Sequence, residues 1–390
     1  MAFKYKVNPE DFIVSEVITL YPSQKGEYSL YLLKKKNLTT WDALGKIAKT
    51  FKLPLKYFGY GGLKDKKAVA TQYITIKGGP KHDLKNPNFE LTYLGKVNEA
   101  LSKEHLLGNN FEIIVREVDI PEEKIFQEVE SVKNFGIPNY FDEQRFSSVS
   151  SSGKFAAKEI ILGNYEEALY LILAESSPDE ITYSKKLRDC LKENWRKWEN
   201  CIKFARLKWE RELLEFLSEH KPSKRTFKRA LNLVDQEYLF YLGNVYQSYL
   251  WNEVLKEILK YLNVVEFSIP FFLGEFYFYR SLSEENFKIL KNFKIPFPSP
   301  KLNLEDTEEL PHKTLYFEVL KREGFKDLKE LRSFIKGLIF KTYPRPAITL
   351  PQNLTCEKVS EKTYRLRFFL EKGSYATLVI KRIFYADKNS

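Results

Sequence analysis

The apolar residues of the first third of the chain alternate between two periods. Phe12–Ile18 and residues 28–32 follow β-type patterns, and residues 72–76 form a third such run. Residues 41–51 and 122–134 instead place apolar side chains on one face of a helix. The two kinds of segment do not follow each other in the regular alternation of a doubly wound sheet. This part of the chain therefore predicts an α+β arrangement.

The pattern changes near Phe146. Residues 147–153 are small and polar and predict a boundary or an exposed loop, and helical patterns dominate beyond them. Between Trp195 and Phe216 apolar residues recur every three or four positions, which predicts one face of a long helix. Its tryptophans could stack on nucleic-acid bases. A stripe at this spacing more often packs inside a protein, and we expect a buried face.

The C-terminus returns to a strand-like pattern. Apolar and polar residues alternate through residues 364–370, and a turn at Gly373 and Ser374 precedes a second β-type run at residues 377–380. The two ends of the chain therefore resemble each other and differ from the middle. This pattern predicts one α+β domain that is interrupted by a helical insertion.

Length and charge narrow the class of protein. The chain has 390 residues, enough for two or three domains, and its net charge of +11 points to a polyanionic partner, either nucleic acid or an anionic membrane surface. No apolar run approaches the roughly 18 residues of a membrane-spanning helix. The N-terminus shows no signal-peptide pattern, so we expect a cytoplasmic protein.

Cysteine and histidine argue against a metal site. The three cysteines, Cys190, Cys201 and Cys356, are too few and too scattered for a disulfide framework or a zinc site. The four histidines never pair at helical spacing. We therefore expect no metal centre built from these residue types.

The positive charge is concentrated in residues 185–229, which hold 15 Lys and Arg against seven Asp and Glu. The segment is either a solvated helix face or a surface that follows phosphates, and the sequence leaves both open. For the second interpretation, the candidate RNA-docking residues are Lys224, Arg225, Lys228 and Arg229.

A second feature is a single carboxylate among lysines. Asp65 follows a Gly-rich turn and is flanked by Lys64, Lys66 and Lys67, just before a predicted strand. Nearby ammonium groups favour the ionised carboxylate, which can act as a nucleophile or general base on a polyanionic substrate. The alternative is a charged surface turn.

The segment after Pro138 combines side chains that suit RNA. Asn139 can hydrogen-bond a base edge, Phe141 offers a ring for a splayed base, and Arg145 can hold a phosphate or a carboxylate. Taken alone, the segment also fits a loop with buried aromatic residues.

Together these segments resemble the TruD family of pseudouridine synthases. The resemblance rests on blocks in the family's order that span nearly the whole chain, namely residues 6–16, 62–72, 105–111, 138–146, 246–252, 345–346 and 372–377. Ser147 and Asp142 stand where the family usually has glycine, which affects the expected loop geometry but not the expected chemistry.

The resemblance implies a pseudouridine synthase catalytic domain with a mixed, mainly antiparallel sheet, formed by residues 1–145 and 344–390. A helix-rich TRUD domain, residues 146–343, is inserted into it. By position, Asp65 is similar to the catalytic aspartate, and Phe141 would stack on the target uracil. Asn139 would hold the aspartate or the base, and Lys6 would pair with Asp65 or a phosphate. Lys64 and Arg145 complete the expected substrate contacts.

The implied reaction converts uridine to pseudouridine in RNA, most simply tRNA with uridine 13 as the first target. It needs no cofactor, metal or membrane, and a monomer is expected. The target base must be flipped out of the folded RNA. Whether Asp65 forms an adduct or removes the 2′ proton stays open. A non-catalytic RNA-binding or RNA-folding module on the same fold is the main alternative. A metal-dependent nuclease would need more carboxylates than Asp142 and Glu143.

Overall fold

The chain forms two compact units in the computed structural model, which describes residues 3–175 and 182–385. The first unit joins Met1–Asn139 to Ile348–Ser390, and the second is Tyr140–Ala347. The predicted insertion, 146–343, lies within the second unit. The limits of that unit fall a few residues outside the predicted ones, so that Phe141 and Arg145 belong to it.

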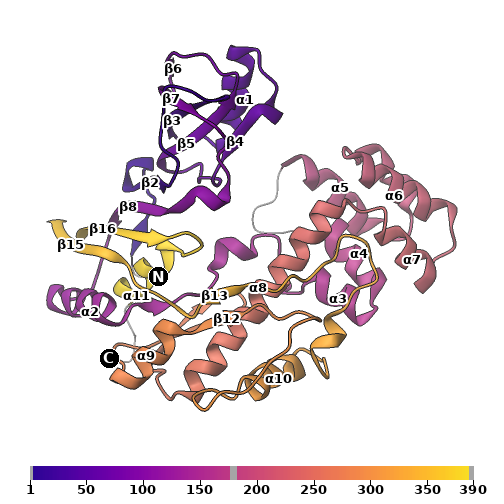
Figure 1. The fold of residues 1–390 in the computed structure, drawn as a ribbon. Helices are drawn as coiled ribbons and strands as arrows, with labels where there is room; N and C mark the ends of the chain where they lie inside the picture. Colours follow the sequence, from indigo (N-terminus) through magenta and orange to yellow (C-terminus); the bar gives the residue numbers. More distant parts are fainter. Residues whose placement is uncertain (1–2, 176–181, 386–390) are drawn as a thin grey trace. The chain divides into compact units, whose positions relative to one another are not determined.

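A ten-stranded sheet runs through the first unit (Figure 1). Its central order is β15-β16-β8-β2-β5-β3-β7-β6, with β1 beside β8 and β4 beside β5. The described pairs are antiparallel except β2 with β5. The predicted α+β class with a mainly antiparallel sheet is confirmed. The strands are β1 (Lys4–Tyr5), β2 (Phe12–Ile18), β3 (Tyr28–Lys36), β4 (Phe58–Tyr60), β5 (Val69–Lys77), β6 (Leu84–Asn86), β7 (Phe89–Val97), β8 (Leu106–Arg116), β15 (Gln352–Ser360) and β16 (Thr363–Glu371).

Helix α1 (Thr40–Phe51) packs on β3, β5 and β7 through most of the face predicted from its periodicity, but Trp41, which was expected on that face, is 51% exposed. Leu44 and Ile47 are fully buried in this core beside Leu33 and Ile74. The Thr39 side chain begins the helix by accepting a hydrogen bond from the backbone N–H of Asp42. This packing fixes the start of α1 against the strands that flank Asp65.

The C-terminal run at residues 377–380 is helical, so the predicted strand is wrong. It belongs to α11 (Ala376–Phe384), whose residues are almost all buried. A short apolar run does not distinguish a buried helix from a buried strand by its period, and here tertiary packing decides the outcome.

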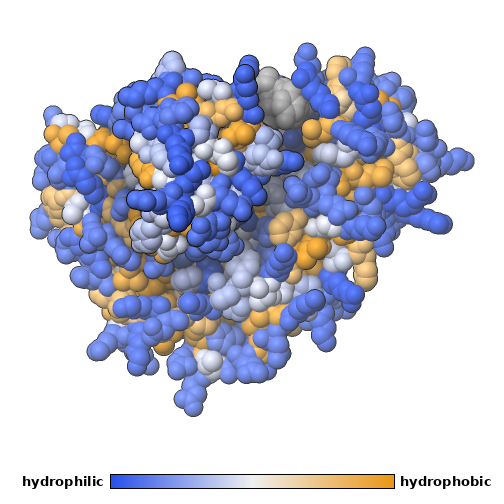
Figure 2. Space-filling model, turned by 45° about the horizontal axis from the view of Figure 1, so that its top comes forward, coloured by the Kyte–Doolittle hydropathy of each residue, from blue (hydrophilic) through white to orange (hydrophobic). Residues whose placement is uncertain are grey.

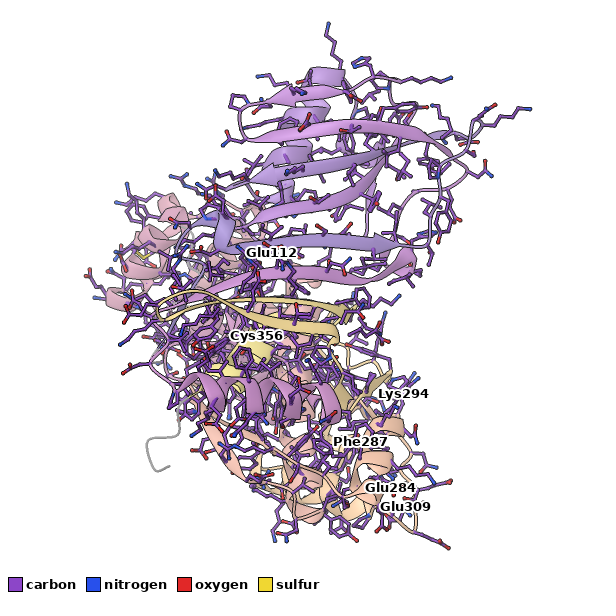
Figure 3. All side chains as sticks on the ribbon, turned by 90° about the vertical axis from the view of Figure 1, so that its left-hand side faces the viewer. Glu112, Glu284, Phe287, Lys294, Glu309 and Cys356 are labelled. Atoms are coloured by element: carbon purple, nitrogen blue, oxygen red, sulfur yellow. A yellow bond between two sulfur atoms is a disulfide. The ribbon has the colours of Figure 1, made fainter. Side chains whose placement is uncertain are left out.

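Helices α2 (Glu122–Phe135) and α11 are joined by a buried ion pair. Arg382 donates from Nη1 to Glu128 and from Nη2 to the Ser131 hydroxyl at 2.8 Å. The two charged side chains are 1% and 8% exposed. Figure 3 shows this part of the unit, with Glu112 on β8 and Cys356 on β15 labelled.

The chain passes from the first unit to the second and back again, and the two strands at these crossings pair with each other within the first unit. Strand β9 (Ile137–Pro138) is antiparallel to β14 (Ile348–Thr349). Gly136 precedes β9 with φ +68°, and a Cβ at that position would lie 2.5 Å from the Thr349 carbonyl oxygen. Glycine is required there because both the conformation and the close approach exclude a side chain.

The second unit is built around the 26-residue helix α8 (Gln236–Tyr261), whose buried side chains face several neighbours. The hairpin β10 (Phe267–Phe271) and β11 (Gly274–Phe278) and the pair β12 (Lys294–Pro296) and β13 (Pro344–Pro346) complete it. The other helices are α3 (Ala156–Leu162), α4 (Tyr165–Leu173), α5 (Thr182–Glu193), α6 (Lys208–Glu219), α7 (Lys224–Leu231), α9 (Glu284–Asn292) and α10 (His312–Arg322).

The long helix predicted between Trp195 and Phe216 is wrong. Helix α5 ends at Glu193, Arg196 has φ +70°, and two 3₁₀ turns precede α6. A 3₁₀ turn repeats every three residues, so it produces nearly the same apolar spacing as an α-helix. Trp198 is buried as expected, whereas Trp195 and Trp209 are half-buried.

A disulfide joins Cys190 in α5 to Cys201 between the 3₁₀ turns, with Cα atoms 5.7 Å apart. The sequence contains too few cysteines for a disulfide framework, and the structure has this single link. Cys356 is a free thiol, and burial raises its pKa to about 11.

Among the described residues, none of the helices is both long and apolar enough to cross a membrane. The face drawn in Figure 2 is mostly hydrophilic, with apolar residues in scattered groups.

Candidate active site

Asp65 lies in the loop between β4 and β5, and its carboxylate forms an ion pair with the ammonium group of Lys6. The two side chains are 30% and 19% exposed. Lys6 follows β1 with φ +56°, and its Nζ lies 4.2 Å from the centroid of the Phe12 ring. The cation that meets Asp65 thus comes from the distant N-terminal strand, and the carboxylate keeps access to solvent.

One buried lysine donates hydrogen bonds to the backbone of the loop at Asp65. Lys35 in β3 is 1% exposed, and its Nζ donates to the carbonyl oxygens of Leu38 at 2.7 Å, Lys64 at 3.2 Å and Asp65 at 2.8 Å. Burial lowers the pKa of Lys35 to about 8, while the charge of Asp65 acts in the opposite direction. Lys35 therefore fixes the backbone from which the Asp65 side chain projects.

Two further buried side chains fix the same loop. The Thr40 hydroxyl accepts from the backbone N–H of Lys64 at 3.0 Å and donates to the Gln72 side chain at 2.9 Å. The Gln72 amide donates in turn to the carbonyl of Gly62 at 3.4 Å. A loop tied at several backbone groups presents its carboxylate in a defined position.

The sequence predicts a substrate contact for Lys64, but the side chain of Lys64 is only 8% exposed and pairs with Glu16 in β2. The other oxygen of Glu16 accepts from the backbone N–H of Tyr73 at 3.0 Å. Burial raises the pKa of Glu16, and the Lys64 charge opposes that rise. A buried carboxylate needs a nearby cation, and the sequence does not show that Lys64 supplies it.

Asn139, Phe141 and Arg145 lie around the unit boundary. Asn139 is buried at the end of the segment that belongs to the first unit, whereas Phe141 and Arg145 belong to the second. The structure therefore joins Lys6 to Asp65 in one unit and Phe141 to Arg145 in the other.

The Phe141 ring packs among aromatic and cationic side chains of the second unit. Trp251 and Phe297 contact it edge to face, and the guanidinium carbon of Arg345 lies 4.1 Å from its centroid. Arg145 lies 5.7 Å from the same centroid and donates to the Ser248 hydroxyl at 3.0 Å. The Asn252 side chain fixes the Phe141 backbone through two hydrogen bonds of 2.8 Å.

The four candidate docking cations share helix α7. Lys224, Arg225 and Arg229 are exposed and Lys228 is half-buried. In the described part of the chain, none of the four forms an ion pair with a carboxylate. Lys224 and Lys228 lie 5.8 and 5.9 Å above the Tyr165 ring. These cations are therefore available to an anionic ligand.

Within the described ranges, His, Cys, Asp and Glu form no group of three or more that could hold a metal ion. The residues around Asp65 are instead lysines, a threonine and a glutamine, whose donors suit backbone and carboxylate oxygens.

Comparisons with known proteins agree with the resemblance in the sequence. The family model "tRNA pseudouridine synthase D (TruD)" matches residues 2–383. A Methanocaldococcus jannaschii protein named "Probable tRNA pseudouridine synthase D 2" is 38% identical over 99% of this chain and 92% of its own length. An Aquifex aeolicus protein named "tRNA pseudouridine synthase D" is 32% identical over all of both chains.

A solved structure shares the fold. The crystal structure of a putative tRNA pseudouridine synthase D (TruD) from Methanosarcina mazei matches with a TM-score of 0.71, at 24% identity, over 98% of this chain and 94% of that one. Fold and sequence thus define the class, which is that of the pseudouridine synthases. The chain belongs to the TruD family. The predicted family and enzyme class are confirmed.

Proposed function

We propose that this protein isomerises uridine to pseudouridine in tRNA, with Asp65 as the catalytic residue and uridine 13 as the first target. The observation that carries the proposal is the ion pair between Asp65 and Lys6 in a loop held by the buried Lys35. Relatives named as tRNA pseudouridine synthases support tRNA as the substrate. Because tRNA is found in the cytoplasm, we also propose that the protein acts there.

The reaction breaks the N1–C1′ bond of uridine and forms a C5–C1′ bond. C5 loses its proton and N1 gains one, so the product is an isomer of the substrate. An ionised carboxylate at Asp65 can act on the ribose or on the uracil, and Lys6 favours that ionised form. Partial exposure of Asp65 leaves room for a flipped nucleotide to reach it.

Phe141 is the proposed stacking partner of the flipped uracil. Stacking on an aromatic ring is worth roughly 1–3 kcal/mol per base, which offsets much of the few kcal/mol that base flipping costs. Phe141 is 8% exposed, so the side chains around its ring would have to move when the uracil stacks on it. Asn139 and Arg145 would add polar contacts to the base or its phosphate.

The RNA would dock on α7. Its four cations lack carboxylate partners among the described residues, so phosphates can replace solvent counterions around them. The local excess of positive charge in residues 185–229 favours the same surface.

Replacement of the Asp65 carboxylate tests the catalytic assignment. We expect Asp65→Asn to abolish tritium release from a tRNA transcript that carries 5-tritiated uridine, with transcript binding retained. Asp119→Asn is the matched control, because Asp119 is an exposed acid of the same unit that forms an ion pair with the exposed Lys362. Continued tritium release by Asp65→Asn would favour a non-catalytic role for Asp65.

A further inference from the structure

A pocket of about 790 Å³ opens in the second unit between α4, α7 and the turn that follows α5. Tyr165, Tyr170 and Trp195 line one side of it with half-buried rings. Trp195 contacts Tyr170 edge to face at 4.9 Å between centroids, and it contacts the buried Trp198 at 4.5 Å. These three rings form an aromatic wall of the pocket, and the buried Trp198 supports it.

The acidic residues of the lining are already neutralised. Glu166 accepts from Nε and Nη2 of Arg196, both at 2.7 Å, and from the Trp195 indole N–H at 3.1 Å. The hydrogen bonds from Arg196 lower the pKa of Glu166. Glu167 pairs with Lys154 at 2.7 Å. An anionic ligand would thus meet no uncompensated carboxylate of this lining.

Positive charge borders the aromatic wall, because the Lys224 ammonium group lies 5.8 Å from the centroid of the Tyr165 ring. Lys224 lies in the first turn of α7, and no described carboxylate pairs with it. The Ser223 hydroxyl caps the helix by accepting from the Thr226 N–H at 3.1 Å. The first backbone N–H groups of a helix lack internal partners and carry partial positive charge, which adds to that of Lys224.

We infer that this pocket, lined by Tyr165, Tyr170, Trp195, Ser223 and Lys224, binds one unpaired nucleotide of the RNA substrate outside the catalytic centre. The base lies against the aromatic wall, and its phosphate lies at Lys224 and the start of α7. The volume falls within the roughly 300–1,000 Å³ of small-ligand pockets. Because every base has a π-face, such a site recognises an unstacked nucleotide with little regard to sequence. The inference rests on the proposed function, since it assumes an RNA substrate.

The aromatic wall separates this proposal from a docking site for an acidic protein segment. An acidic segment would use the cations of α7 but would gain little from the ring faces. Substitution of Tyr165 therefore distinguishes a nucleotide from an acidic segment, and substitution of Lys224 tests the contribution of charge.

The first experiment measures KM and kcat for a tRNA transcript in the full chain. We expect Tyr165→Leu and Lys224→Met each to raise KM by roughly 5- to 100-fold with kcat unchanged, since a stacked base or a phosphate contact is lost. Tyr165→Phe keeps the ring and should retain the wild-type KM. Tyr261→Leu replaces a tyrosine that is 53% exposed in α8, and it serves as the matched control.

The second experiment compares two anionic probes by direct binding. A short oligouridylate has bases, whereas heparin has charge alone. We expect Tyr165→Leu to weaken oligouridylate binding and to leave heparin binding unchanged. An equal effect on both probes, or none on either, overturns the nucleotide pocket. If the wild type releases tritium and Tyr165→Leu has the wild-type KM, only the nucleotide pocket is contradicted. If the wild type neither binds the transcript nor releases tritium, the proposed function is contradicted as well.

Discussion

The Lys35 ammonium group donates a hydrogen bond of 2.8 Å to the backbone carbonyl of Asp65 from a position that is almost completely buried. The same group contacts the carbonyls of Leu38 and Lys64. One side chain of β3 thus supports the backbone of the proposed catalytic residue.

Lys35→Met should lower kcat more than it changes KM. The substitution leaves one buried and two part-buried carbonyl groups without this donor, which costs about 1–3 kcal/mol of stability and releases the loop. Tritium release and urea unfolding measure the two effects. Lys34→Met alters the exposed neighbouring lysine and should match the wild type. A Lys35→Met enzyme with normal kcat would show that the loop holds its shape without Lys35.

The buried position of Lys35 also predicts a pH dependence of stability. Burial lowers its pKa in the folded protein from 10.5 to about 8, with Asp65 opposing the shift. Between about pH 8 and pH 10 the unfolded chain therefore binds more protons at Lys35 than the folded protein does, so the contribution of Lys35 to the free energy of unfolding rises with pH. Urea unfolding at pH 7, 8 and 9 should show that the free energy of unfolding of the wild type rises with pH relative to that of Lys35→Met. A constant difference would contradict the lowered pKa.

The cations of α7 should control the salt dependence of RNA binding. Charge reversal at Lys224, Arg225, Lys228 and Arg229 should weaken tRNA binding and flatten the slope of log affinity against log salt, by about one per lost phosphate contact. Filter binding across a salt series measures the slope. Reversal of Lys288 and Lys291, exposed lysines of α9 in the same unit, is the matched control. Equal slopes for both variants would identify α7 as a solvated surface.

Loss of Arg382 should destabilise the first unit strongly. Arg382→Met leaves the buried Glu128 carboxylate without its cation, and breaking such a pair costs about 3–5 kcal/mol. Lys358→Met removes an exposed pair with Glu122 and should cost less than about 1 kcal/mol. Denaturant unfolding compares the two variants, and similar losses would contradict the role of burial.

The disulfide predicts a simple thiol count. The denatured chain should show one reactive thiol without reductant, from Cys356, and three after reduction. Closing a loop of this size stabilises by about 2–3 kcal/mol, so reductant should lower the melting temperature of the wild type. Cys201→Ser should abolish that response to reductant, whereas Cys356→Ser should keep it. Three free thiols before reduction would contradict the link.

The sequence predicted the parts of this protein that depend on local pattern. The α1 and α2 helices and the alternating strands have their expected positions because their periods are long and clear. The blocks that span nearly the whole chain, including those around Asp65 and Phe141, identified the family because their order along the chain is specific. The period of the apolar residues gave wrong predictions at α11, where packing determines the structure, and after α5, where 3₁₀ turns determine it.

The residues that support the site were not visible in the sequence. Lys35 is the middle of three consecutive lysines, and only the alternation of strand β3 turns it inward while its neighbours face solvent. Glu16 and Lys64 are separated by 48 positions, so their pairing depends on the register of the sheet. Lys6, which meets Asp65, is also remote in the chain, and its pairing was expected only from the family resemblance. Lys66 and Lys67, which are adjacent to Asp65 in sequence, are exposed.

The pairing of β9 with β14 affects how the segment between these strands can be exchanged. The chain leaves the first unit just after Pro138 and returns to it at Ile348, on two strands that are hydrogen-bonded to each other. Lys35, Thr40 and Gln72, which hold the Asp65 loop, all lie before the first crossing. A different set of helices could therefore be grafted between these two strands without altering a strand register around the Asp65 loop.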